Sequence, residues 1–180
     1  MTRRFTIPLA LAVIVCAVPH ASADSPAPSG YRAVAEVYGV PSDVFYAVAL
    51  AESGRRIAAL AAIRPWPWTL NVEGDGRFYS SRWAAASALQ DTLAVGRTSV
   101  DVGLMQINWH HHRAALGQAD AALDPYRNLN IAAAILVACH RAQGDWWAAV
   151  GCYHAPRDAD RAARYRDRVR AIWRDLPDSK

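Results

Sequence analysis

One acidic side chain lies in an otherwise apolar segment. Glu52 follows Ala49-Leu50-Ala51 and precedes Ser53-Gly54. A carboxylic acid that stays protonated near neutral pH can deliver a proton to a poor leaving oxygen, such as that of a glycosidic bond. Apolar surroundings raise the pKa of a carboxyl group into the range that this task requires. We therefore predict that Glu52 is a catalytic acid and base, and not a surface residue that merely ends a helix.

Three further segments carry polar side chains in a recognisable order. They are Ser99-Val100-Asp101-Val102-Gly103-Leu104-Met105-Gln106-Ile107-Asn108-Trp109, Asn128-Leu129-Asn130-Ile131-Ala132-Ala133 and Ala149-Val150-Gly151-Cys152-Tyr153-His154. Together with the Glu52 segment, they resemble the motifs of the soluble lytic transglycosylase family, which is related to goose-type lysozyme. The resemblance extends from about Tyr31 to Trp173 and is greatest to small members encoded with conjugation and type IV secretion systems.

The resemblance implies that one carboxyl group cleaves the β-1,4 bond between MurNAc and GlcNAc in peptidoglycan. Glu52 would protonate the bridging oxygen and then accept a proton from the C6 hydroxyl of MurNAc, which attacks its own anomeric carbon to give a 1,6-anhydro product. The high effective concentration of an intramolecular nucleophile makes a second carboxylate less necessary. The expected substrate-binding residues are Ser53, Met105 as a wall of the groove, Gln106, Asn108 and Tyr153, whose phenol would bond to Glu52. His154 departs from the family, which usually has Asn there.

Hydrolysis by a pair of carboxyl groups, as in a true lysozyme, is the alternative reaction. Glu73, Asp75 and Asp101 are the candidates for the second group. We expect Glu73 and Asp75 to lie in a solvated turn and Asp101 to cap or brace the Gly103 turn. A carboxylate about 5 Å from Glu52 across a cleft would instead indicate a retaining lysozyme. The alternative to an enzyme is a non-catalytic scaffold protein that binds peptidoglycan as part of a secretion channel.

Apolar spacing and helix-breaking residues predict the elements that position these segments. Helices are expected at residues 31–38, 42–53, 82–94 with a cap at Ser80-Ser81, 128–143 with Asn128 as N-cap, 146–153 and 158–173, the last with Tyr165 facing inward. Residues 69–79 predict a hairpin. About 50 residues separate Glu52 from Gly103, more than in the general family, and the resulting insertion between residues 60 and 100 also holds Trp66 and Trp68, as sugar platforms or as packing. The expected fold is mainly α: a lysozyme-like single domain over residues 31–175 with one small β-hairpin insertion.

The first 23 residues have the three parts of a secretory signal peptide. Arg3-Arg4 precede an apolar run of about 14 residues, which ends before Ala21-Ser22-Ala23. A bilayer needs about 20 residues, so we expect cleavage after Ala23, a periplasmic or secreted protein and no stable membrane anchor. Val15 before Cys16 disfavours lipidation. Residues 24–30, rich in Ser, Pro, Ala and Gly, are expected to form a flexible lead-in.

Cysteine spacing and charge limit the remaining function classes. Cys139 and Cys152, about 13 residues apart, are expected to form a disulfide in an oxidising compartment. We expect His110-His111-His112 to start a surface helix, on which adjacent residues do not face one another, so we expect neither a metal site nor a cofactor. The net charge is only +4, and arginines 157–174 alternate with other residues, which disfavours nucleic acid. The expected partners of this monomer are glycan strands and secretion or conjugation proteins.

Overall fold

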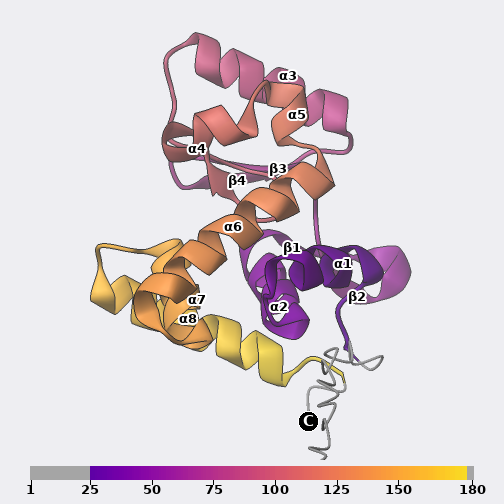
Figure 1. Cartoon of the computed structure of the whole chain (residues 1–180). Helices are drawn as coiled ribbons and strands as arrows, with labels where there is room; N and C mark the ends of the chain where they lie inside the picture. The colour runs from indigo at the N-terminus through magenta and orange to yellow at the C-terminus, as the bar shows by residue number, and fades with distance from the viewer. Residues whose placement is uncertain (1–24, 178–180) are drawn as a thin grey trace, which may run out of the picture.

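The computed structural model describes residues 25–177, in which two groups of elements are joined by one long helix (Figure 1). This helix, α6 (Pro125–Gln143), runs from an upper group that contains the main sheet to a lower group of helices. The signal-peptide prediction and Cys16 lie outside the described residues. The expected lead-in is packed rather than loose, because Ala27 is buried and the Ser25 and Ser42 hydroxyls lie 2.8 Å apart.

The lower group is built around a nearly fully buried helix. Its helices are α1 (Ser29–Tyr38), α2 (Ser42–Ser53), α7 (Trp146–His154) and α8 (Ala159–Arg174). Seven apolar side chains of α2 are buried around its whole circumference, as in the central helix of a core. Helix α8 contacts both α2 and α7, so it completes the packing around the end of α2 that carries Glu52.

The β structure is larger than the single hairpin expected. The predicted hairpin is present as β3 (Thr69–Val72) and β4 (Asp75–Phe78), and positive φ angles at Glu73 and Gly74 (54° and 97°) fit its tight turn. Strands β5 (Val100–Val102) and β6 (Ile107–Asn108) extend it to a sheet of order β4-β3-β5-β6. A second antiparallel pair, β1 (Gly54–Ile57) and β2 (Ala62–Pro65), flanks a 3₁₀ turn at Ala58–Leu60.

The upper group also contains three helices. Of the two predicted helix caps, Ser81 and Asn128, one is correct. The helices are α3 (Arg82–Ala94), α4 (Trp109–Leu116) and α5 (Ala119–Ala122). Ser81 caps α3 as predicted, since its hydroxyl accepts from the Ala84 amide. The prediction that Asn128 caps α6 is wrong: the helix begins at Pro125, Asp124 is its cap, and the Asn128 side chain is buried one turn inside.

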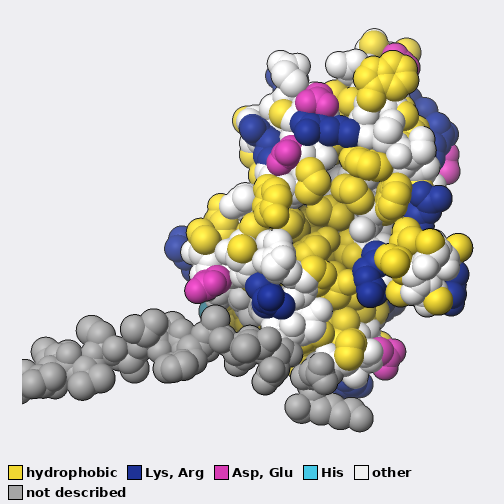
Figure 2. Space-filling model, turned by 90° about the vertical axis from the view of Figure 1, so that its right-hand side faces the viewer, with side chains coloured by type: hydrophobic (Ala, Val, Ile, Leu, Met, Phe, Trp, Pro, Cys, Tyr) yellow, Lys and Arg dark blue, Asp and Glu magenta, His cyan; other side chains and the backbone are white. Residues whose placement is uncertain are grey.

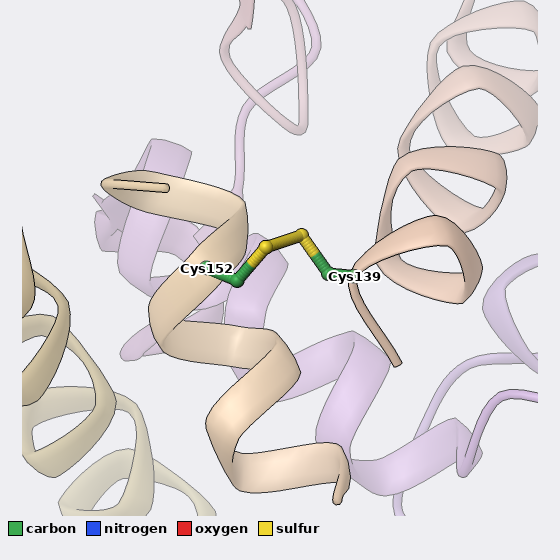
Figure 3. Close-up of a disulfide and its surroundings, with 2 residues drawn as sticks. All are labelled: Cys139 and Cys152. Carbon is green, nitrogen blue, oxygen red and sulfur yellow. A yellow bond between two sulfur atoms is a disulfide. The ribbon is translucent and has the colours of Figure 1, made fainter. Parts of the chain in front are cut away.

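The predicted disulfide is confirmed. Cys139 of α6 and Cys152 of α7 are joined, with their Cα atoms 5.8 Å apart (Figure 3). The bond fixes α7 against the long helix, and α7 in turn packs on α8. The disulfide therefore braces the helices that lie next to Glu52.

The two tryptophans of the insertion pack onto their own segment. The indole of Trp66 donates to the Tyr79 carbonyl at 2.7 Å, and its ring meets Trp68 edge to face. This is the packing alternative, not a sugar platform beside Glu52.

Figure 2 shows apolar side chains gathered across the middle of one face of the molecule. Within residues 25–177 no single helix is long and apolar enough to cross a membrane, although α1 and α2 pass that test as a bent pair.

Candidate active site

A cleft of about 800 Å³ lies between the upper and lower groups, and Glu52 lines it. The upper wall comes from β3, β5, β6 and the start of α4; the lower wall comes from the end of α2 and from α6, α7 and α8. The lining residues are Ala51, Glu52, Asn71, Ser99, Asp101, Gln106, Ile107, Asn108, His111, His112, Ile135, Tyr153, His154, Ala155, Pro156, Arg157, Asp158, Arg161 and Arg168. The sequence-predicted Glu52, Gln106, Asn108 and Tyr153 therefore share one cavity.

The surroundings of Glu52 raise its pKa to about 7. Burial of the carboxyl group is the largest cause, because it disfavours the charged form. A hydrogen bond from Tyr165 and the positive charge of Arg168 lower the pKa in part, and the negative charge of Asp101 adds a small increase. Glu52 is thus a carboxylic acid that can both give and take a proton near neutral pH.

The sequence led us to expect that the Tyr153 phenol contacts Glu52, but the phenol that does so is that of Tyr165. Tyr165 of α8 donates its hydroxyl to Glu52 Oε1 at 2.5 Å. Tyr153 instead donates to the Met105 carbonyl at 2.6 Å, although it still lines the cleft. The helical pattern predicted that Tyr165 faces inward, but no sequence signal indicated that Glu52 would be its partner.

A second group from α8 also reaches the end of α2. The Arg168 guanidinium donates to the Ala51 carbonyl, next to Glu52 in the chain. Arg168 and Tyr165 are three residues apart on α8, so one face of this helix supplies both contacts. Arg168 was not among the predicted site residues.

His154, at the position that departs from the family pattern, supports Tyr165. Its imidazole stacks on the Tyr165 ring, with centroids 4.2 Å apart and planes 4° from parallel. Desolvation, Arg161 and Arg168 all lower the pKa of His154, which favours the neutral ring near neutral pH. A neutral, stacked imidazole restricts the Tyr165 ring and hence the hydroxyl that contacts Glu52.

The Gly-Leu-Met-Gln segment forms a turn that is pinned to α6. Gly103 has φ of 82°, and a Cβ there would lie 2.6 Å from the Asn128 amide nitrogen, so both backbone and space require glycine. Asn128 donates to the Val102 carbonyl and accepts from the Met105 amide, both at 2.8 Å. Because these groups are buried, Asn128 supplies hydrogen bonds that water cannot.

The turn directs one of the predicted ligands into the cleft. Gln106 has φ of 47°, a strained value for a residue with a side chain. Its side-chain nitrogen, Nε2, donates to the Gly103 carbonyl at 2.9 Å and to the Thr69 carbonyl at 3.3 Å. No described residue donates to Gln106 Oε1, so this oxygen is available to accept from a sugar hydroxyl or acetamido group.

Two predicted substrate ligands lie in the core instead. Met105 is completely buried, and its backbone, not its side chain, serves the site. Ser53 is 1% exposed and donates to the Leu104 carbonyl at 2.7 Å, which ties the end of α2 to the turn. Both residues position the cleft and do not line it.

One of the three candidate second carboxylates lies in the cleft. Asp101 lines it, with its pKa raised chiefly by burial, and accepts a hydrogen bond from the Asn108 amide at 2.8 Å. Asn108 also caps α4 through the His111 amide. Glu73 and Asp75 lie elsewhere, in exposed ion pairs with Arg97 at 2.7 Å and Arg77 at 2.6 Å.

The histidines of the 110–112 run begin α4, as predicted. His111 and His112 line the cleft opposite α8, which the sequence did not indicate. Among the described residues, no group of three or more His, Cys, Asp or Glu side chains is arranged to hold a metal ion.

Comparison with known proteins assigns the chain to a family. Searches of curated proteins and of solved structures returned no match. The family model described as Transglycosylase SLT domain matches residues 31–175, which include every element of the cleft. The chain therefore belongs to the transglycosylase SLT domain family, whose members are peptidoglycan lytic transglycosylases that act as glycosidic-bond lyases.

Proposed function

We propose that Glu52 is the single acid and base that cleaves the MurNAc–GlcNAc β-1,4 bond with formation of 1,6-anhydro-MurNAc. The observation that carries the proposal is the half-buried Glu52 side chain, whose carboxyl group has a pKa of about 7 and lines a cleft. The chain that forms this cleft belongs to a family of peptidoglycan-cleaving enzymes. Tyr165 donates to Oε1, which leaves Oε2 to carry the acidic proton. A phenol on one oxygen thus determines which oxygen delivers the proton.

The reaction then needs two proton transfers through one group. The Glu52 proton passes to the bridging oxygen as the C1–O bond breaks, and the GlcNAc fragment leaves with a 4-hydroxyl group. The Glu52 carboxylate next takes the proton of the MurNAc C6 hydroxyl, whose oxygen bonds to C1. Arg168 and Tyr165 stabilise the transient carboxylate, since both favour its charged form.

The test is the chemistry of the released ends. Digestion of purified peptidoglycan, followed by mass spectrometry of the muropeptides, should give anhydro ends. Glu52→Gln should release almost none, while Glu73→Gln, an exposed carboxylate outside the cleft, should digest normally. Exclusive formation of reducing ends would refute the anhydro mechanism.

Asp101 supports a second candidate, hydrolysis by a lysozyme mechanism. Its carboxyl group lines the same cavity as Glu52 and contributes to the raised pKa of Glu52. In a hydrolase it would activate water or stabilise the positive charge at C1. Asp101→Asn would then abolish release of reducing ends, whereas the anhydro mechanism predicts that anhydro ends persist in this variant.

We also propose a periplasmic or secreted location and local opening of the cell wall for a conjugation or secretion apparatus. A signal-peptide-like N-terminus and the disulfide support the location. The resemblance to small secretion-linked enzymes supports the role. Detection of the chain in periplasmic extracts tests the first claim. Loss of conjugation or secretion with Glu52→Gln, at unchanged protein level, tests the second.

A further inference from the structure

The lower wall of the cleft is rich in guanidinium groups. Arg157, Arg161 and Arg168 all line it, together with two carboxyl groups, those of Glu52 and Asp158. Arg161, Tyr165 and Arg168 follow the spacing i, i+4, i+7, so they occupy the face of α8 that meets Glu52. Positive charge is therefore concentrated on the wall next to the catalytic acid.

Two of these arginines have no acidic partner among residues 25–177. Arg157 and Arg161 make no ion pair within 4.0 Å among the described residues. The Asp158 carboxylate accepts from the Arg161 backbone amide and caps α8. Arg168 differs, because its guanidinium is held by the Ala51 carbonyl. The side chains of Arg157 and Arg161 are exposed and remain available to a ligand in the cleft.

The opposite wall has no comparable positive charge. It presents the amides of Asn71 and Asn108, the Ser99 hydroxyl, the half-buried Asp101 side chain and two histidines. A strand that lies in the cleft therefore meets hydrogen-bonding groups on one side and free guanidinium groups on the other. Such a wall selects for an anionic group on one side of the glycan.

We propose that Arg157 and Arg161 form a carboxylate-binding subsite for the acidic groups that project from muramic acid. This inference rests on the proposed action on peptidoglycan. Guanidinium groups bind carboxylates through paired, charge-assisted hydrogen bonds. The carboxylates come from the peptide stem or, on strands without peptides, from the lactyl group of muramic acid itself. GlcNAc carries no such group, so the subsite distinguishes the two sugars and sets the register of the strand against Glu52.

The test compares binding of three forms of the glycan strand. The forms are peptide-bearing strands, strands stripped by an amidase, and stripped strands whose lactyl carboxylates have been converted chemically to amides. The binding chain carries Glu52→Gln, so that no strand is cut, and the comparison adds R157Q and R161Q together. Arg164→Gln, an exposed arginine of α8 outside the cleft, is the matched control.

We expect the double arginine change to weaken binding of carboxylate-bearing strands by roughly tenfold or more. It should leave binding of amidated strands unchanged, and the Arg164 control should bind all forms normally. An effect confined to peptide-bearing strands identifies the stem as the source, and an effect on stripped strands identifies the lactyl group. The subsite is overturned if the double variant binds every form as tightly as its Glu52→Gln parent does, or if it loses as much affinity for amidated strands as for carboxylate-bearing ones.

The binding assay also separates this inference from the proposed reaction. In chains that retain Glu52, the double change should raise KM with little change in kcat, because the contact persists from ground state to transition state. Release of reducing instead of anhydro ends would refute the proposed mechanism and leave the carboxylate dependence of binding intact. Loss of that dependence, with anhydro ends still formed, would refute the subsite alone.

Discussion

Replacement of Glu52 by glutamine should stabilise the folded protein at alkaline pH while it abolishes activity. The pKa of Glu52 is about 7 in the folded chain, against an ordinary value of 4.5. The native state therefore holds this proton more tightly than the unfolded state does. The associated stability is fully present below about pH 4.5 and is lost as the pH rises through 7. At about 1.36 kcal/mol per pKa unit, the loss is about 3 kcal/mol.

Glutamine stays neutral at every pH and avoids this loss. The variant and the unaltered chain should have similar free energies of unfolding at pH 4, and the variant should be more stable by about 3 kcal/mol at pH 8. For a domain of this size the difference corresponds to roughly 6–12 °C in Tm. Urea unfolding followed by tryptophan fluorescence at pH 4, 6 and 8 measures it.

The matched control is Glu73→Gln. Glu73 is exposed and accepts a hydrogen bond from Arg97, which lowers the pKa of Glu73, so removal of its charge should bring no gain in stability at pH 8. If Glu52→Gln is no more stable than the unaltered chain at pH 8, the carboxylate is not desolvated in the folded state. The basis for its role as an acid near neutral pH would then be lost.

Three further changes test the surrounding contacts. Tyr165→Phe removes the hydrogen bond that lowers the pKa of Glu52, so the alkaline fall of kcat/KM should move to higher pH; an unmoved profile would contradict the contact. Asn128→Ala leaves a buried amide and a buried carbonyl unpaired and should reduce the free energy of unfolding in urea by about 2–4 kcal/mol; a loss well under 1 kcal/mol would mean that water replaces the side chain. Joint replacement of Cys139 and Cys152 by alanine should reduce it by about 3 kcal/mol, and a reductant should destabilise the unaltered chain but not this variant.

The helices were predictable because their signals are local. Apolar spacing placed α2, α3, α7 and α8 to within a residue or two, and Ser81 was recognised as a cap. The start of α6 was predicted three residues late, because Asp124-Pro125 supplies the cap and first turn there. Asn128 is a favourable cap by type, but its long-range bonds to the Gly103 turn determine its role.

Most of the β structure could not be predicted because the strands contain two to four residues each. Strands this short show no readable alternation of apolar and polar side chains. Only β3 and β4 have a recognisable turn sequence between them. The β5–β6 pair depends instead on the turn from Gly103 to Gln106, whose geometry is fixed by contacts from other elements.

The sequence predicted the catalytic acid of the site better than it predicted the residues that contact this acid. Glu52 follows from one carboxylate in an apolar segment. Its contact with Tyr165 joins residues 113 positions apart, and it depends on how α8 packs against α2. Helical periodicity predicts that Tyr165 faces inward, but it cannot predict which group lies opposite.

The positions of Ser53, Met105 and Tyr153 change how the four sequence segments function. Ser53 and Tyr153 donate to the backbone of the turn, at the carbonyls of Leu104 and Met105. These bonds fix the upper wall of the cleft, including Gln106 and Asp101, relative to the end of α2 and to α7. These hydrogen bonds would persist if side chains of the turn were replaced by other apolar side chains, because the acceptors are backbone atoms.

The groups that tune the acid come from outside those segments. Tyr165 and Arg168 both belong to α8, and both favour the charged form of Glu52, against the effect of burial. Without them, burial alone would raise the pKa of Glu52 further, and the group would be a weaker acid toward the bridging oxygen. The segments recognised in the sequence therefore hold Glu52 in place, and α8 adjusts its acidity to a value at which one carboxyl group can both donate and accept.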